Sequence, residues 1–457
     1  MSEKNKSKKP DSLSRRDFLK STAWAGIGTA LSSKITKGNP LTPKKPYQEN
    51  SDKVNIAVIG TGTQGRVLIE SCLRIPGIHF QAICDIWEYS QRYASRYLQK
   101  YGYKVNVYED YRELLEKEKN LDAVIIATPD WVHAEHANAC MEYGHHVYCE
   151  KEMSNSLEEA RSMVKTSKRT GKLLQIGHQR RSNPRYIHAI DRLIHEKKLL
   201  GRVSKAYAQW NRAKSDMLGW PEKYIIPPVK LEKYGYGSMT EFRNWRWFKK
   251  YSGGPMVDLG SHQIDLFSWV FGCHPSSIIS CGGIDYYENR EWYDNVMAIY
   301  EFQSTQGTSR ALYQVQTTTK YGGFYEAFMG DNGTIELSEV PQMGNWAMRE
   351  AHAPEWDSLV KEGLLESETP PVQKVDTKNI FLDVRVTQEA GRWQLPIELA
   401  KPPHQPHLEN FFSAIRNGAS LSCPGEVGFG TAVAVLTANK AVESPRQIKF
   451  HKEQFKA

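Results

Sequence analysis

Three features that would point to other functions are missing from this 457-residue chain. Its seven cysteines form no C-x-x-C pair or other ligand-like spacing, so no metal site is expected and most of the thiols are interpreted as core residues. No apolar run is long enough to span a membrane. Residues 1–45 hold eleven Lys or Arg and three Asp or Glu, a net charge of +8 that equals that of the whole chain. The remaining body is therefore close to neutral, and no nucleic-acid partner is expected.

The first 50 residues are interpreted as an export signal and linker. Residues 14–20 read SRRDFLK, and these paired arginines precede a short, modestly apolar stretch over residues 21–32. This layout is typical of a twin-arginine signal, so we expect the twin-arginine export machinery as a partner and a periplasmic location. A disordered basic tail is the alternative, and no convincing cleavage site is found near residues 31–37.

A glycine-rich motif follows this tail. Residues 54–65 read VNIAVIGTGTQG, in which a β-branched apolar run leads directly into Gly60-x-Gly62-x-x-Gly65. The run predicts a buried parallel strand. In a dinucleotide site Gly60 permits a tight turn, Gly62 lets the pyrophosphate approach the backbone, and Gly65 lets a helix pack closely on the strand. A glycine-rich turn in an unrelated α/β domain is the alternative.

The surroundings of the motif favour the dinucleotide interpretation. A helix predicted over residues 66–74 and a strand over residues 79–84 place Asp85 twenty residues after Gly65. Asp85 can accept hydrogen bonds from a ribose 2′-hydroxyl and would repel a 2′-phosphate, so NAD is favoured over NADP. The helix N-terminus, which includes Thr63 and Gln64, offers N–H groups and positive dipole to the phosphates.

Export and cofactor binding constrain each other. Twin-arginine export moves proteins that are already folded, and no NAD pool exists outside the cytoplasm to replace a lost cofactor. We therefore expect the protein to hold its cofactor between turnovers and to regenerate it in place.

The periodicity predicts two domains after the tail, an NAD(P)-binding domain over residues 51–178 and a substrate-binding domain over residues 179–457. In the first, strands alternate with helices, which predicts an α/β Rossmann domain with a doubly wound parallel sheet. Its strands are predicted over residues 54–59, 79–84, 121–128, 146–150 and 173–176, and its helices include residues 131–143 and 157–170, with Ser154 at the start of the second.

The second domain is predicted to be α+β with C-terminal helices. Its long alternating strands suggest a large, mostly antiparallel sheet with one open face. That face needs a cover, so a homo-oligomer, either a dimer or a tetramer, is expected. Residues 341–378 are expected to form an extended loop or a subunit contact. Strands are predicted over residues 202–212, 277–286, 295–302, 309–318, 325–329 and 334–338, and helices over residues 184–198, 407–417 and 427–443.

Two further motifs carry side chains suited to alcohol oxidation. Glu150-Lys151 follows a predicted strand, and the carboxyl ends of such strands border the ligand crevice. Asp258 and His262 are four residues apart, which places both on one face of a helix. An imidazole titrates near neutrality and can take the hydroxyl proton as hydride leaves the same carbon. A surface ion pair for Lys151, a core position for His262 and a helix cap for Asp258 are the alternatives.

These motifs, in this order, resemble those of the Gfo/Idh/MocA family, named for glucose–fructose oxidoreductase, inositol dehydrogenase and a rhizopine-catabolism protein. The resemblance runs from Asp52 to the C-terminus. It includes the glycine loop, Glu150-Lys151, the string GGPMVDLGSHQID that contains Asp258 and His262, and residues 127–137, which resemble the loop beside the nicotinamide. The family usually reads Glu-Lys-Pro, whereas this chain has Glu152, which puts the path of the following loop in doubt.

The resemblance implies roles for individual residues. Lys151 would bind the substrate hydroxyl and relay its proton, His262 would be the general base, and Asp258 would orient the substrate. Cofactor contacts are implied for Thr128, Pro129, His133, Glu150 and Lys151, with His133 near the nicotinamide ribose. Arg180 or Arg181 would lie near the pocket mouth.

The aromatic content between the two motifs suggests the substrate. Trp210, Trp220, Trp245 and Trp247 fall in one segment with Tyr234 and Tyr236, and Asn211, Arg212, Arg243 and Asn244 lie among them. Aromatic rings stack on pyranose rings, so a segment of this composition facing the crevice would favour a sugar or glycoside, with Trp210 among its contacts. Core aromatics are the alternative.

Three functions remain open at this point. The first is an oxidoreductase that oxidises a secondary alcohol of a sugar or glycoside, for instance at C3, and is reset by a second carbonyl compound. The second is a redox-neutral glycoside lyase or hydrolase that uses transient oxidation and elimination. The third is a non-catalytic sugar-binding protein that keeps the nucleotide as structure; the intact Lys151, Asp258 and His262 speak against it.

Overall fold

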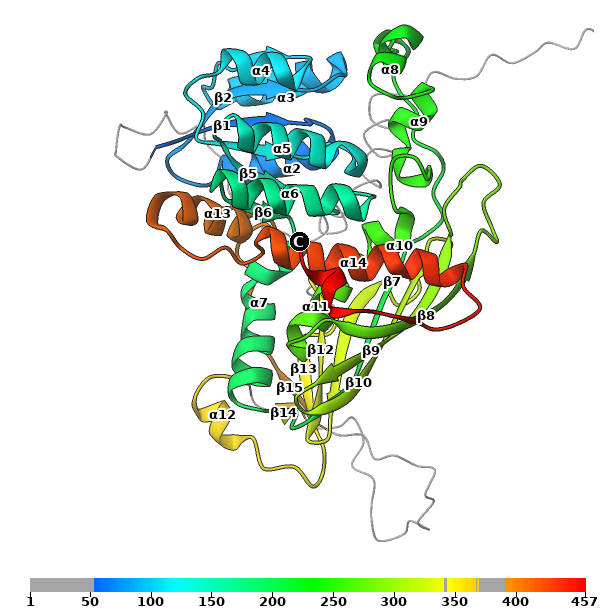
Figure 1. The fold of residues 1–457 in the computed structure, drawn as a ribbon. Coiled ribbons are helices and arrows are strands. Elements are labelled where there is room, and N and C mark those ends of the chain that lie inside the picture. The colour runs from blue at the N-terminus through cyan, green and yellow to red at the C-terminus, as the bar shows by residue number, and fades with distance from the viewer. Residues whose placement is uncertain (1–52, 341–342, 367, 370–390) are drawn as a thin grey trace, which may run out of the picture.

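The computed structural model describes residues 53–340, 343–366, 368–369 and 391–457 (Figure 1). The predicted export signal lies outside these residues. Within the described ranges, no helix is both long and apolar enough to cross a bilayer.

The first part of the chain forms a six-stranded parallel sheet in the order β3-β2-β1-β4-β5-β6. The order reverses between β1 and β4, and the crevice at such a point binds the ligand in doubly wound folds. The predicted Rossmann sheet is thereby confirmed. The strands are β1 (Val54–Ile59), β2 (Ile78–Cys84), β3 (Asn106–Tyr108), β4 (Ala123–Ile126), β5 (His146–Cys149) and β6 (Leu174–Ile176).

Five helices connect these strands. They are α2 (Thr63–Cys72), α3 (Glu88–Lys100), α4 (Tyr111–Lys117), α5 (His133–Glu142) and α6 (Leu157–Thr170). Side chains cap the N-termini of two of them, α4 and α6. The hydroxyl of Ser156 accepts from Glu159 N at the start of α6, and Gly171 ends this helix at φ 68°. The predicted start at Ser154 was therefore two residues early.

The second sheet has ten strands in the order β14-β15-β13-β12-β11-β7-β10-β9-β8-β16. Its neighbours are antiparallel except for β7 and β10, which are parallel, so the predicted mostly antiparallel sheet is confirmed. The strands are β7 (Val203–Asn211), β8 (Pro275–Gly283), β9 (Asn295–Ser304), β10 (Gly307–Gln316), β11 (Phe324–Gly330), β12 (Gly333–Leu337), β13 (Trp346–Arg349), β14 (Glu368–Thr369), β15 (Arg392–Gln394) and β16 (Ile448–Lys449).

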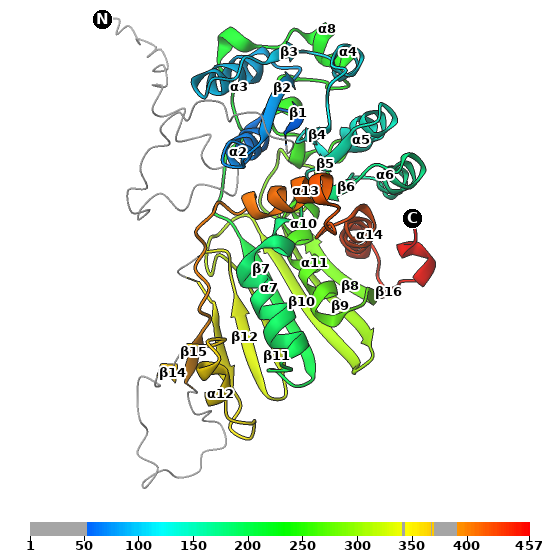
Figure 2. The same cartoon turned by 90° about the vertical axis from the view of Figure 1, so that its left-hand side faces the viewer.

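Helices cover one face of this sheet (Figure 2), and apolar side chains are exposed on the other face. The covering helices include α7 (Pro184–Ile187), which continues as a π-helical stretch over His188–Glu196, and α11 (Gly260–Phe271). On β8 and β9 the side chains of Ile279, Met297 and Ile299 are exposed. The alternation along these strands therefore separates a core face from an apolar open face.

The segment predicted as an extended loop, residues 341–378, is more structured than expected in its described part. It contains β13, α12 (Asp357–Lys361) and β14. β13 pairs with β12 on one side and with β15 on the other. Because β15 lies more than 40 residues further along the chain, this pairing left no local signal in the sequence.

Between β7 and α10 (Gly254–Asp258), an insertion crosses to the first domain. It contains α8 (Pro228–Lys233) and α9 (Met239–Arg243), which lie beside α3 and α4 of the first domain in Figure 1. The Nζ atom of Lys230 lies 2.5 Å from Oε2 of Glu109, and the indole of Trp87 donates to Tyr224 O at 2.6 Å. The insertion is therefore fastened to the Rossmann domain.

The C-terminal helices α13 (Gln405–Asn417) and α14 (Gly425–Val442) return to the parallel sheet. Leu408, Phe411 and Phe412 join the core on one side of it, and Phe429 and Val433 join the core on the other. Residues from the end of the chain thus complete the core of the domain that begins it.

Candidate active site

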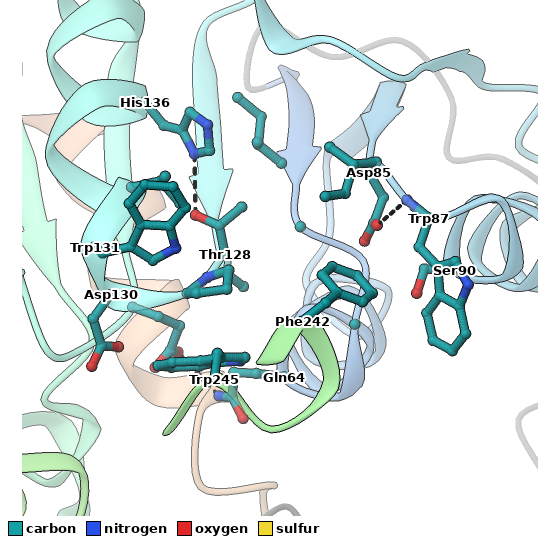
Figure 3. Close-up of a pocket in the computed structure, with 18 of the residues that line it drawn as sticks. Gln64, Asp85, Trp87, Ser90, Thr128, Asp130, Trp131, His136, Phe242 and Trp245 are labelled. Carbon is teal, nitrogen blue, oxygen red and sulfur yellow. Dashed lines mark hydrogen bonds between the residues drawn. The ribbon is translucent and has the colours of Figure 1, made fainter. Parts of the chain in front are cut away.

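One cleft of about 470 Å³ runs from the glycine loop to the second domain (Figure 3). Both domains and the insertion supply its walls. Residues from the first domain include Gly60, Gly62, Thr63, Gln64, Asp85, Trp87, Thr128, Pro129, Asp130, Trp131, His136, Glu150 and Lys151. Later segments supply Gln179, Arg212, Tyr234, Tyr236, Phe242, Arg243, Trp245, Arg246, Asp258, His262 and His404.

The glycine loop has the shape that a pyrophosphate needs. Gly60 has φ 88°, and a Cβ there would lie 2.6 Å from the backbone of Ala127. A Cβ on Gly65 would lie 2.0 Å from the carbonyl oxygen of Gly60, whereas one on Gly62 would meet nothing within 4 Å. Helix α2 begins after Gly62 without a side-chain cap, so its first N–H groups are free to bind an anion. The loop therefore fits a dinucleotide in the way its glycines predict.

Asp85 lies at the end of β2 and lines the same cleft. Its Oδ2 atom accepts from Thr61 N at 2.8 Å, and Oδ1 accepts from Trp87 N at 2.9 Å. Burial raises the pKa of this carboxyl, and the two backbone donors oppose that rise. These contacts fix the carboxylate at the position expected for a ribose partner.

The two distant motifs that contain Lys151 and Asp258 meet in this cleft. The Nζ atom of Lys151 lies 2.9 Å from Oδ1 of Asp258 and donates to its backbone oxygen at 2.5 Å. Burial alone would raise the pKa of Asp258, but Lys151, Arg246 and Arg212 hold it well below its usual range. Both side chains are largely buried, at 9% and 12% exposure. Asp258 is therefore an ionised anchor for the lysine.

His262 lines the cleft beside this pair, with 3% exposure. Burial and then the charge of Lys151 lower the pKa of its imidazole well below the usual value, so the ring is neutral near pH 7. Its Nδ1 atom has no partner within the described residues. Asp258 and His262 do not share one continuous helix, because α10 ends at Asp258 and α11 begins at Gly260. They nevertheless face the same space.

The loop after β4 differs from expectation in its histidine. His133 is buried at 1% exposure, and its ring nitrogens lie 2.7 Å from Glu152 O and from Thr128 O. It connects two loops and does not line the cleft itself, so a direct contact with the nicotinamide ribose stays a prediction. His136, one helical turn later, lines the cleft and lies 3.1 Å from Thr128 Oγ1 (Figure 3).

The structure places neither Arg180 nor Arg181 in the lining of the cleft, although one of them was expected near its mouth. Arg180, at 1% exposure, pairs with Glu326 and with Glu339, whose Oε2 atom lies 3.0 Å from its Nε. Arg181 pairs with Asp265, its Nε lying 2.8 Å from Oδ2. Both guanidiniums form buried ion pairs, and these pairs connect the turn after β6 to the second domain. Neither lines the cleft, and Gln179 takes their place there.

Trp210 is a core residue and not the sugar contact that was predicted. It is 2% exposed, stacks on Phe324 with ring centroids 4.4 Å apart, and lies 5.6 Å from the ring of His262. It therefore packs against the imidazole ring of His262. The aromatic surface of the cleft comes instead from Trp131, Tyr234, Tyr236, Phe242 and Trp245.

Glu152, which replaces the usual proline of the family, is fully buried. Its Oε1 atom accepts from Met153 N at 2.7 Å, and Oε2 has no partner within the described residues. Burial raises the pKa of Glu152 to about 8, so this carboxyl is protonated near neutrality. It adds no negative charge beside Lys151 at pH 7.

Several cleft residues carried no motif in the sequence. Arg212 and Arg246 flank Asp258, with Arg246 Nε 3.4 Å from its Oδ2. Asp130 lies behind them, and burial together with Asp258 raises its pKa to about 7. His404 lies 2.9 Å from Gln64 Nε2, which also donates to Glu150. The only signal for the arginines was their place among the tryptophans.

The insertion closes the cleft from the side opposite the glycine loop. Figure 3 shows Phe242 and Trp245 across the cleft from Thr128 and Asp85. Gly235 packs against Trp131, where an added Cβ would lie 2.5 Å from the indole ring. Trp131 also makes an edge contact with Tyr236 at 5.6 Å. A bound dinucleotide would therefore be covered by side chains from both domains.

Comparison with known families agrees with this geometry. Residues 54–178 match the model described as "Oxidoreductase family, NAD-binding Rossmann fold" of GFO_IDH_MocA, and residues 229–336 match the "GFO/IDH/MocA C-terminal domain". Together the two matches cover just over half of the chain. The protein belongs to the Gfo/Idh/MocA family. The family resemblance inferred from the motifs is thereby confirmed.

Curated relatives of this Gfo/Idh/MocA protein include sugar-type dehydrogenases. An inositol 2-dehydrogenase of Rubrobacter xylanophilus is 31% identical over 30% of this chain and 39% of its own length. A glycosyl hydrolase family 109 protein of Solibacter usitatus is 34% identical over 35% of this chain and 37% of its own length. The chain thus spans about two fifths of the length of these relatives.

Solved structures share the fold over nearly their whole length. The WlbA dehydrogenase of Bordetella pertussis, solved with NADH and UDP-GlcNAcA, has a TM-score of 0.62 and 16% identity, covering 87% of this chain and 99% of that one. An aldose-aldose oxidoreductase of Caulobacter crescentus has a TM-score of 0.64 and 16% identity, covering 87% and 100%. At these identities the likeness concerns the fold.

Proposed function

We propose that this protein oxidises a secondary alcohol of a sugar or glycoside, for instance at C3, by hydride transfer to a tightly held NAD. The observation that carries the proposal is the meeting of Lys151, Asp258 and His262 at the end of a cleft that starts at the glycine loop. Hydride transfer requires an acceptor ring, a positioned hydroxyl and a base, and this cleft offers a place for each.

The residues divide the work as follows. When bound, the nicotinamide ring supplies the acceptor for the hydride. Lys151, held by Asp258, donates a hydrogen bond to the substrate oxygen and so orients the alcohol. The neutral imidazole of His262 takes the hydroxyl proton, directly or through Lys151. The lowered pKa of His262 keeps its imidazole unprotonated near pH 7, so that the ring can accept a proton.

NAD is proposed over NADP because Asp85 is fixed at the end of β2. Retention of the cofactor follows from the cover that the insertion provides. The Lys230–Glu109 pair and the Trp87–Tyr224 hydrogen bond would both have to break for this cover to open. A cofactor held in this way has to be oxidised again in place, which calls for a second, carbonyl-bearing substrate.

Location and assembly belong to the same proposal. The SRRDFLK segment supports export by the twin-arginine machinery to the periplasm. Retention of the cofactor agrees with that location, because free NAD is not available there. The apolar open face with Ile279, Met297 and Ile299 supports a homo-oligomer, a dimer or a tetramer, in which this face is covered.

The sugar class of the substrate is supported by the aromatic walls of the cleft and by the relatives. Trp131 and Trp245 line the same cleft as Asp258 and His262. Two relatives are named as inositol dehydrogenases, and a cyclic polyol resembles a pyranose in shape and hydroxyl pattern.

The test is a single-turnover measurement on protein purified without added nucleotide. Denatured protein should release NAD in a near-stoichiometric amount. Addition of a panel of glycosides to the intact protein should raise the absorbance of reduced nicotinamide, and Lys151→Ala should not show this rise. Protein that purifies empty of nucleotide would contradict the retention, and a bound cofactor that no sugar reduces would contradict the oxidation.

A redox-neutral reaction is the second candidate, because four of the relatives are named glycosyl hydrolase family 109 proteins. Transient oxidation would acidify the neighbouring C–H, the glycosidic oxygen would leave, and the hydride would return. Product analysis separates the two reactions. Cleaved glycoside without a need for an electron acceptor favours elimination, whereas an intact keto-glycoside favours the oxidoreductase.

A further inference from the structure

The substrate end of the cleft carries more positive than negative charge. Lys151, Arg212 and Arg246 surround a single ionised carboxylate, that of Asp258. Asp130 is the other carboxyl at this end, and burial raises its pKa to about 7. The imidazole of His262 is neutral, and Glu150 is turned toward Gln64. At least one cationic group is therefore not balanced by the protein.

Arg212 is the less satisfied of the two arginines. Lys151 Nζ lies 2.9 Å from Oδ1 of Asp258 and Arg246 Nε 3.4 Å from Oδ2, so these two cations share the carboxylate. For Arg212 the described residues supply no side-chain hydrogen bond; its guanidinium carbon lies 5.5 Å from the ring centre of Trp210. A guanidinium left half-buried without an acceptor is costly unless a ligand supplies one.

The position of Arg212 is fixed by the sheet. It directly follows β7, and its backbone N–H donates to Gln316 O at 2.8 Å. The side chain crosses Trp210, which stacks on Phe324 and lies against His262. Arg212 therefore faces the space where the sugar would lie. The phosphates of the cofactor would bind at the other end, at the N-terminus of α2.

We propose that the sugar is anionic, a uronic acid or uronide whose carboxylate binds to Arg212. A planar carboxylate matches the two-pronged geometry of a guanidinium. A monoanion also fits better than a phosphate, because this end of the cleft offers only one guanidinium that is not already paired with Asp258. The inference rests on the proposed function, since it assumes that the sugar binds beside Lys151 and His262.

The test compares matched sugars on the protein as purified, with its own cofactor. Methyl glucuronide, methyl glucoside and glucose 6-phosphate are each added, and both cofactor reduction and binding by calorimetry are followed. Because a hydrogen bond to a charged group is worth roughly 1.5–3 kcal/mol, the glucuronide should exceed the glucoside about 10- to 100-fold in kcat/KM and in affinity. The phosphate should be no better than the glucoside.

Variants of Arg212 test whether this residue causes the preference for the glucuronide. Arg212→Gln should reduce the glucuronide-to-glucoside ratio at least about tenfold, mainly through KM, and Arg212→Lys should restore part of it because the charge is kept. Arg192→Gln is the matched control: Arg192 is an exposed arginine paired with Glu196, and its loss should leave the ratio unchanged. A ratio near one in the native protein, or a ratio unaffected by Arg212→Gln, would overturn the proposal, as would a phosphate preferred over the glucuronide.

The two proposals can fail separately. Reduction of the cofactor by the glucoside and the glucuronide with equal efficiency would sustain the proposed oxidation and remove the anionic substrate. Tight, Arg212-dependent binding of the glucuronide without any reduction of the cofactor would sustain the anionic site and remove the oxidation.

Discussion

The ammonium of Lys151 and the carboxylate of Asp258 lie 2.9 Å apart, although 107 residues separate them in the chain. Lys151 stands at the end of β5 and Asp258 at the end of α10, so the pair joins the two domains across the cleft. With His262 beside it, this contact defines the reaction centre of the proposed dehydrogenase.

Removal of the His262 imidazole should abolish reduction of the cofactor but not its binding. His262→Ala is expected to lower the single-turnover rate of cofactor reduction by about 10²- to 10⁴-fold, the usual contribution of a general base. The amount of nucleotide that copurifies should stay the same, because the glycine loop would hold the pyrophosphate and His262 is not part of that loop. Stopped-flow absorbance measures the rate. A variant that still reduces its cofactor at the native rate would exclude His262 as the base.

Substitution of Gly62 and of Gly65 should separate an effect on nucleotide binding from an effect on folding. A Cβ at Gly62 meets nothing within 4 Å, so Gly62→Ala should fold normally and lose bound nucleotide, because the methyl group enters the pyrophosphate space. A Cβ at Gly65 would lie 2.0 Å from Gly60 O, so Gly65→Ala should lose about 3 kcal/mol of stability. Nucleotide content and thermal unfolding are measured for both. Full nucleotide content in Gly62→Ala would contradict the cofactor placement.

Asp85 should determine the choice between NAD and NADP. Asp85→Ser removes the carboxylate that would repel a 2′-phosphate, and Arg66 and Arg243 both lie near enough to interact with charge at this position. The ratio of NAD to NADP affinity should fall by about tenfold or more, which corresponds to roughly 1.4 kcal/mol. Calorimetry on nucleotide-free protein gives this ratio. An unchanged ratio would show that other residues make the discrimination.

Glu152 should make stability fall as the pH rises. Its pKa is raised from 4.5 to about 8 in the folded protein, so the folded state holds a proton that the unfolded state has lost over this range. Stability is then fully present below about pH 4.5 and declines toward pH 8. Glu152→Gln keeps the shape without the titration, and its melting temperature should fall less between pH 5 and pH 8 than that of the native protein. Parallel curves for the two proteins would contradict the buried, protonated carboxyl.

The sequence predicted most of the first domain because its signals are local. The run VNIAVIG, the glycines after it and Asp85 all lie within 32 residues, and each has one mechanical role. Strand β3 was missed, since Asn106–Tyr108 is short and largely exposed and has no apolar pattern. In the second domain, β13 was missed because it is only four residues long; one of its partners, β12, is close in sequence, but the other, β15, lies far along the chain.

The sequence predicted the residues that meet in the cleft better than those expected around them. Lys151, Asp258 and His262 belong to motifs, and the structure brings them together. For Arg180 or Arg181 the family resemblance implied a place near the pocket mouth, but both pair with carboxylates that are far away in sequence, those of Glu326, Glu339 and Asp265. His133 turned inward for the same kind of reason, because two backbone carbonyls lie within reach of its ring.

The return of α13 and α14 to the parallel sheet has a consequence for biosynthesis. Phe411 and Phe429 fill opposite sides of a core whose first strand is Val54–Ile59. The nascent amino-terminal domain therefore leaves the ribosome with part of each face of its sheet still uncovered. It has to wait, shielded by chaperones or only loosely collapsed, until the last fifty residues are synthesised, so this domain is not expected to mature on its own.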